Sequence, residues 1–159
     1  MVRSRVHTID EGDGGACVET LLTRQHELFG RLDSLSQKQS QLIASDETDR
    51  LLRLLNERQD IIDQIARTNS ELEPYRGRWD AFLGELPADR RERVKVRLDA
   101  VAQLAGVIAQ RDEADRRELQ TRRDAMAMEL SRVATGRGAV AAYGPAKDSP
   151  SARFQDREA

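Results

Sequence analysis

Few residues of this sequence stand in a pattern that could perform chemistry. Residues 112–115 spell DEAD, but in helicases that motif acts beside a phosphate-binding loop of the form GxxxxGK followed by Ser or Thr, which this chain lacks. His7 and His26 lie far apart, with no HExxH or ExxH pattern around them, so we expect no zinc or di-iron site. Cys17 has no second cysteine to pair with and is interpreted as an inert thiol. The sequence therefore predicts no catalytic residue, no metal, no cofactor and no enzymatic activity.

The composition argues against a thick globular core. Of 159 residues, 38% are hydrophobic, 34% are charged and only 4% are aromatic. A narrow coiled-coil seam needs fewer apolar residues per turn than a core, so this composition favours elongated helices. The net charge of −2 gives no general attraction to nucleic acid or to anionic membranes. The sequence shows neither a signal peptide nor an apolar run long enough for membrane insertion, so we expect a cytoplasmic protein.

Hydrophobic periodicity predicts an all-α fold made of four helical segments. The first contains a heptad seam, which consists of apolar residues and two glutamines. Successive members of the seam are four and three residues apart in turn. Its members are Leu21, Gln25, Leu28, Leu32, Leu35, Gln39 and Leu42. The predicted segments are 18–45, 46–72, 75–86 and 88–135, and the third, rich in aromatic residues, is expected to plug one end of a bundle. Glycine-containing ends, residues 1–17 and 136–159, are predicted to be a flexible arm and a flexible tail.

The expected architecture is an elongated antiparallel helical bundle or coiled coil. Ser45 or Asp46 can cap a new helix, which favours a chain that folds back there over one that continues with a kink. Residues 18–72 carry seven basic and ten acidic side chains, whereas residues 88–137 carry twelve and nine, so the two arms are complementary in charge. Residues 112 and 115 place aspartates in the apolar seam, where polar residues set register or mark a departure from the neighbouring helix.

Two features of the sequence suggest binding. The first two helices are too short to cover the long helix if the chain folds back, which leaves a distal seam open. Its members are Leu119, Met126, Leu130 and Val133. Methionine suits a surface that accepts more than one partner, although this seam could also pack on the first helix or on a second copy of the chain. In the tail, Tyr143 and Phe154 stand among small and polar residues and could dock on a partner, dock on their own bundle, or have no role.

Several segments together resemble the FlgN-like flagellar export chaperones. After the leucine and glutamine heptads come LIASDETDRLL at residues 42–52 and ERQDII at residues 57–62, an acidic helix restart followed by a charged pair before apolar residues. The long helix with IAQRDE at residues 108–113 is similar to the last helix of that family. The tail, with AYG at 142–144 and RFQDR at 153–157, is similar to the tail of that family.

The resemblance implies a cytoplasmic chaperone that works without ATP. Members bind hook-filament junction proteins before secretion, keep their terminal helices from premature assembly and deliver them to the flagellar type III export gate. A client of this kind would add an amphipathic helix to an open apolar seam, and Leu119, Met126, Leu130 and Val133 are the expected contacts, with Tyr143 and Phe154 as tail anchors.

Two other functions fit the residues. A coiled-coil scaffold would form a stable homodimer or larger oligomer through the same seams without a client. A nucleic-acid-associated helical protein would use the basic run at residues 90–97 and would bind with strong salt dependence, although the net charge argues against it.

Overall fold

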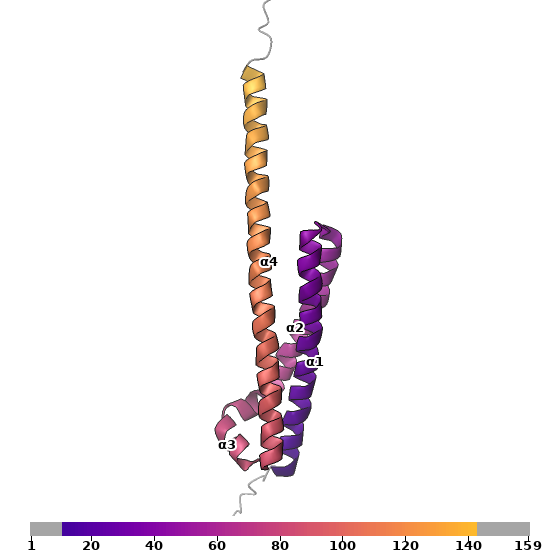
Figure 1. Ribbon diagram of the computed structural model, residues 1–159, viewed down its shortest axis with the longest axis vertical. Helices are drawn as coiled ribbons and strands as arrows, with labels where there is room; N and C mark the ends of the chain where they lie inside the picture. Colours follow the sequence, from indigo (N-terminus) through magenta and orange to yellow (C-terminus); the bar gives the residue numbers. More distant parts are fainter. Residues whose placement is uncertain (1–10, 143–159) are drawn as a thin grey trace, which may run out of the picture. The chain divides into compact units, whose positions relative to one another are not determined.

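The predicted all-α class is confirmed by the computed structural model, which describes residues 11–142 and the side chains of residues 14–140. Within these residues there are four helices and no strand. The helices are α1 (Glu11–Ala44), α2 (Thr48–Arg76), α3 (Trp79–Glu85) and α4 (Ala88–Ala142), as Figure 1 shows. The chain divides into two units, residues 1–119 and 120–159, and each is described by itself. Across the described helices, no segment has the length and apolarity that crossing a membrane requires.

The chain folds back between α1 and α2. The amides of Ser45 and Glu47 donate to carbonyls of the last turn of α1, at 3.0 Å each, and Asp46 takes the left-handed conformation with φ of 60°. Aspartate tolerates that region better than most residues, since its short polar side chain can hydrogen-bond locally. The residue that precedes α2 is Glu47, not the predicted Ser45 or Asp46, and its side chain makes no capping bond. The predicted reversal is confirmed, and the predicted cap is wrong.

Ion pairs show how the helices of the first unit run. Glu19 of α1 pairs with Arg90 and Arg93 near the start of α4, at 3.3 and 2.9 Å. Further along both helices, Asp33 pairs with Arg111 at 2.7 Å. The order of these pairs makes α4 parallel to α1, and therefore antiparallel to α2. They also realise the charge complementarity that the sequence predicts between its acidic and basic arms.

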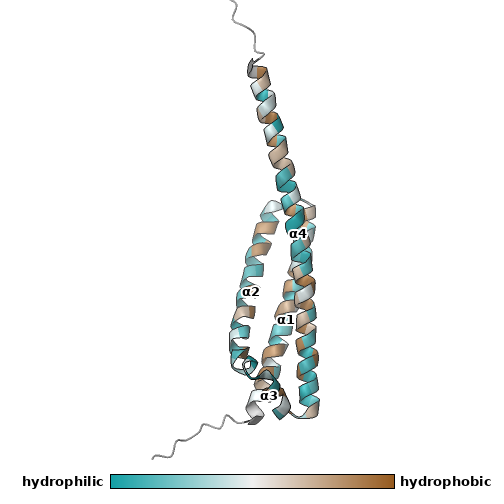
Figure 2. Ribbon diagram, turned by 90° about the vertical axis from the view of Figure 1, so that its left-hand side faces the viewer, coloured by the Kyte–Doolittle hydropathy of each residue, from teal (hydrophilic) through white to brown (hydrophobic). Residues whose placement is uncertain are grey.

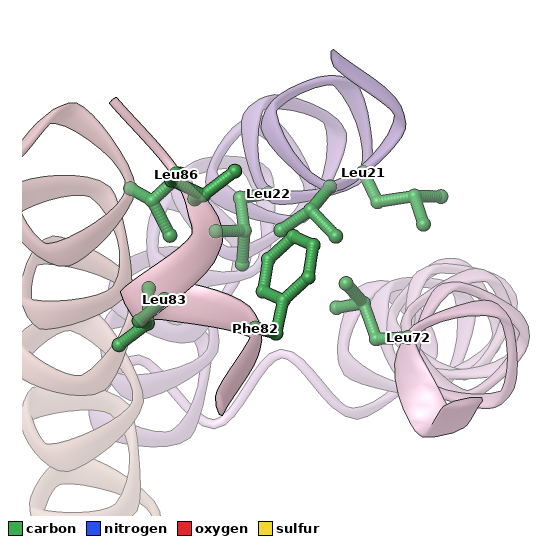
Figure 3. Packing of buried hydrophobic residues seen from close by; sticks show 8 residues of the cluster. Leu21, Leu22, Leu72, Phe82, Leu83 and Leu86 are labelled. Carbon is green, nitrogen blue, oxygen red and sulfur yellow. The ribbon is translucent and has the colours of Figure 1, made fainter. Parts of the chain in front are cut away.

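Two apolar clusters hold the first unit together, and bands of hydrophobic and hydrophilic residues alternate along its helices (Figure 2). The first cluster gathers around Phe82 of α3, whose ring lies among leucines of α1 and α2 (Figure 3). Tyr75 and Trp79 add their rings at 5.1 and 5.8 Å from that of Phe82. The second cluster joins α1, α2 and α4, and its buried members are Leu28, Leu32, Leu35, Leu54, Ile61, Ile65 and Ile108. The aromatic segment is thus a plug, as predicted.

The start of α1 corrects the prediction of a flexible arm as far as residue 17. The helix begins at Glu11 and includes the glycines that the sequence analysis assigned to a linker. A Cβ atom on Gly15 would lie 2.9 Å from Leu86 and 3.0 Å from the guanidinium of Arg90. Glycine is present here because the first turns of α1 approach these side chains closely. Residues 1–10 lie outside the described part of the chain.

Two predicted helix boundaries are also wrong. The second helix does not end at residue 72, since α2 continues through Pro74 to Arg76 and Gly77 follows it. The long helix does not end at Thr135, because α4 passes through Gly136 and Gly138 and reaches Ala142. Each glycine costs a helix about 1 kcal/mol relative to alanine, and strong helix formers such as Ala134, Ala139 and Ala141 stand around the two glycines. Residues 143–159 of the predicted tail lie outside the described residues.

Candidate functional site

A buried polar cluster joins three helices at the place where the sequence puts aspartates in the seam. It consists of Gln39 and Ser40 of α1, Arg58 of α2, and Asp112 and Asp115 of α4. Gln39, Arg58 and Asp115 are 6, 8 and 7% exposed, although most buried seam positions are apolar. Burying such groups is costly unless each one finds a hydrogen-bond partner.

Each member of this polar cluster is satisfied by another. Arg58 donates from both terminal nitrogens to the two carboxylate oxygens of Asp112, at 2.8 and 2.7 Å. Its Nη1 also donates to Oε1 of Gln39. The Nε2 of Gln39 then donates to Oδ2 of Asp115 at 2.7 Å, and the Ser40 hydroxyl donates to Oδ1 of the same carboxylate at 2.7 Å. Arg58 therefore fixes which way the Gln39 amide points, and the cluster specifies one register among α1, α2 and α4.

The DEAD tetrapeptide is thereby accounted for by structural contacts. Asp112 and Asp115 belong to the polar cluster, and Glu113 accepts from Arg116 and Arg117 on its own helix at 2.9 and 3.0 Å. Hydrogen bonds from these two guanidinium groups lower the pKa of Glu113 to about 2. Of the two roles that the sequence analysis gives the seam aspartates, the contacts of Asp112 and Asp115 with α1 and α2 favour the setting of register, and Glu113 forms a helical ion pair with Arg117.

The basic run at the start of α4 is also engaged within the first unit. Arg91 donates to the carbonyls of Leu83 and Leu86 at 2.8 and 3.0 Å, and so closes the end of α3. Arg90 and Arg93 are held by Glu19. These arginines have structural partners, which weakens the reading of the run as a surface for phosphate groups.

A pocket of about 360 Å³ opens between the four helices of the first unit. Leu22, Phe29, Trp79 and Leu98 supply apolar walls, and Arg76 is its one titratable lining residue. The arrangement can accept an apolar side chain, but it holds no pair of groups that could act as acid and base. Among the described residues, no group of three or more His, Cys, Asp or Glu side chains could hold a metal ion.

The predicted binding residues on α4 are exposed. Leu119, the last residue of the first unit, is 45% exposed. In the second unit Met126, Leu130 and Val133 are 67, 69 and 46% exposed, and their spacing of four and three places them on one helix face. Tyr143 and Phe154 lie outside the described residues, so nothing places them near this face.

The same face carries three residues that the sequence analysis missed. Arg123, Arg137 and Val140 continue the alternation of three and four at both ends. We call the resulting set the α4 seam: Arg123, Met126, Leu130, Val133, Arg137 and Val140. Val140 is 72% exposed. Met128 is 61% exposed, but its position in the heptad puts it on the opposite face. The alternating spacing of three and four could have identified these residues from the sequence. Arg137 and Val140 were missed because the helix was expected to end at Thr135.

Comparison of the chain with protein-family models, with curated proteins and with solved structures gives no match.

Proposed function

We propose that this chain is an export chaperone that binds hook-filament junction proteins before they are secreted through the flagellar type III export gate. The observation that carries the proposal is the exposure of Met126, Leu130 and Val133 on one face of α4. Three large apolar side chains in heptad register form the half of a coiled coil that an amphipathic helix of a client can complete. The resemblance of residues 42–52, 57–62 and 108–113 to FlgN-like chaperones supplies the identity of that client.

The contacts of the first unit support a carrier without chemistry of its own. The side chains of the polar cluster hydrogen-bond to one another, and the two apolar clusters are packed within the first unit. The DEAD segment is held by arginines of the same chain. Binding to an exposed helical seam needs no nucleotide. A client that folds as it binds spends part of its interaction energy on ordering, which keeps the complex releasable at the gate. Leu119, Tyr143 and Phe154 remain proposed contacts of the client or the gate.

The test is the affinity of the purified chain for a purified hook-filament junction protein, measured by isothermal titration calorimetry. We expect one-to-one binding that Met126→Asp weakens at least about tenfold, because a carboxylate would enter an apolar interface. Leu52→Asp is the matched control, since Leu52 is an exposed leucine of α2 that does not belong to the α4 seam, at 56% exposure. A chain that ends at Ala142 keeps all of α4 and isolates the contribution of Tyr143 and Phe154.

Absence of binding to the junction protein would overturn the proposed function. Unchanged affinity in both Met126→Asp and the chain ending at Ala142 would remove the assignment of these residues. Equal losses in Met126→Asp and Leu52→Asp would mean that the substitutions act through general charge instead of the seam.

The second candidate, a coiled-coil scaffold, is favoured by a separate surface of α2. Leu52, Leu55 and Ile62 are 56, 42 and 40% exposed, and their spacing puts them on one outward face. A scaffold would sediment as a stable homodimer at micromolar concentration, and Leu55→Asp together with Ile62→Asp would dissociate it. A monomer by analytical ultracentrifugation would exclude this candidate.

A further inference from the structure

The α4 seam is not uniformly apolar, because two of its six positions are arginines. In heptad notation Met126, Val133 and Val140 occupy d positions, whereas Arg123, Leu130 and Arg137 occupy a positions. The two arginines are fourteen residues apart, which is two heptads. The three apolar seam residues that carry the proposed function lie between them. No ion pair of either arginine is found within the described residues.

These arginines disfavour pairing of the seam with a second copy of itself. In a parallel pair in register, each arginine meets the same arginine of the other copy, and like charges at such positions are repulsive. In an antiparallel pair, Arg123 faces Val140 and Arg137 faces Met126. Only Arg137 then comes near a carboxylate, that of Glu129, and Arg123 is buried beside apolar groups without a partner.

The positions beside the seam hold one acid, Glu129, which is six residues from Arg123 and eight from Arg137 and so lies outside the three- or four-residue spacing of a helical ion pair. The positions that follow the d residues hold Ala127 and Ala134, which are small and neutral. A helix can therefore approach closely between the two arginines. The guanidinium groups of Arg123 and Arg137 then need hydrogen-bond acceptors from another molecule. Arginine suits this task because its planar guanidinium binds a carboxylate through two parallel hydrogen bonds.

We infer that the α4 seam takes a helix with apolar residues at its central seam positions and two acidic residues, fourteen apart, opposite Arg123 and Arg137. The inference rests on the proposed function, since it specifies the chemistry of the client helix. Each acid neutralises an arginine as the seam is covered, so the pairs discriminate between apolar helices and exclude the chain itself.

The test uses three synthetic helical peptides of three heptads, identical except at two seam positions fourteen residues apart. These positions hold Glu in the first peptide, Lys in the second and Leu in the third. Fluorescence anisotropy with the full chain should give the Glu peptide an affinity at least about tenfold above that of the Lys peptide, with the difference shrinking at high salt. The variant Arg123→Glu with Arg137→Glu should reverse this order. Arg132→Glu, which reverses one positive charge outside the seam, should leave the order unchanged.

The outcomes separate this inference from the proposed function. Equal binding of the Glu and Lys peptides, tightest binding of the Leu peptide, or binding of none of them would overturn the inference. An unchanged order in the reversed variant would overturn it as well, because the discrimination would then come from elsewhere. A chain that prefers the Glu peptide but binds no junction protein keeps the inference and loses the identity of its client.

Discussion

Replacing Arg58 by methionine tests whether the buried polar cluster holds the three helices in register. The Arg58 side chain is 9% exposed and donates to Asp112 and to Gln39. Methionine keeps most of the buried stem but removes all of these donors. Asp112 is 39% exposed, so water can reach its carboxylate after the change, and the loss of this pair costs about 1 kcal/mol or less.

The larger cost comes from Gln39, which is 6% exposed. Its Oε1 loses the donor that fixes it, and an unsatisfied buried acceptor costs about 1–3 kcal/mol. We therefore expect Arg58→Met to lower the free energy of unfolding by about 1–4 kcal/mol. Urea denaturation, followed by far-UV circular dichroism and by the fluorescence of Trp79, measures this free energy. The slope of the free energy of unfolding against urea concentration should be the same in both proteins.

Matched variants decide what the loss means. Arg53→Met, at an exposed position of the same helix, should change the free energy of unfolding by less than about 0.5 kcal/mol. Asp115→Asn should be nearly neutral, because the new amide can accept from Gln39 and donate to the Ser40 hydroxyl. Adding Gln39→Leu and Asp115→Leu to Arg58→Met should restore most of the stability, since apolar groups of similar size often replace a buried charged cluster without cost. A loss below about 0.5 kcal/mol in Arg58→Met would refute the reasoning, because water would then satisfy Gln39 unaided.

Other substitutions probe the close contacts and charges of the first unit. Gly15→Ala should give a free energy of unfolding at least about 1 kcal/mol lower than Gly30→Ala does, because the Cβ at residue 15 would lie 2.9 Å from Leu86 and the end of that buried side chain must shift. Gly30→Ala, which has open space around it, should raise that free energy by up to about 1 kcal/mol in the same urea titration. Arg91→Met should lower it by about 1–3 kcal/mol by freeing two carbonyls at the end of α3, and hydrogen exchange should show faster opening there. The pKa of Glu113 lies near 2 instead of 4.5. Its ion pairs therefore stabilise the fold fully at pH values above 4.5, and this stabilisation is lost as the pH falls toward 2. Glu113→Gln should flatten that part of the acid titration, and an unchanged slope would contradict the assignment.

The elements of the first unit were predictable because they follow from periodicity. The alternating spacings of four and three in residues 21–42 indicate a helix, and the acidic segment before Thr48 favours a break. The series of hydrogen bonds from Arg58 through Gln39 to Asp115 was only half predictable. The sequence marked Gln39 and the seam aspartates as polar seam residues, but Arg58 looks like any charged helix residue until α2 is placed against its neighbours.

The failures at the ends have a common cause. Glycine was interpreted as a helix breaker at residues 12–15 and 136–138, since its intrinsic cost in a helix is about 1 kcal/mol. That cost is small beside the contacts of a packed turn, and Gly15 occupies a place where a larger residue would collide with Leu86. Propensity is a weak guide wherever tertiary packing or neighbouring alanines favour the helix, and no pattern in the sequence reveals a close approach between helices.

Charged residues interrupt the apolar seam of α4 in two places, and the comparison between them supports the proposal that the second place is a binding surface. At Asp112 and Asp115 the seam is covered, and α1 and α2 supply a guanidinium, an amide and a hydroxyl that match the carboxylates. At Arg123 and Arg137, charged residues again occupy seam positions, but this part of the seam is exposed. Neither arginine has such a partner among the described residues. A buried charge is stable only with its complement. The chain therefore supplies its own complementary groups where it folds, and we propose that another helix supplies them to the seam of the second unit.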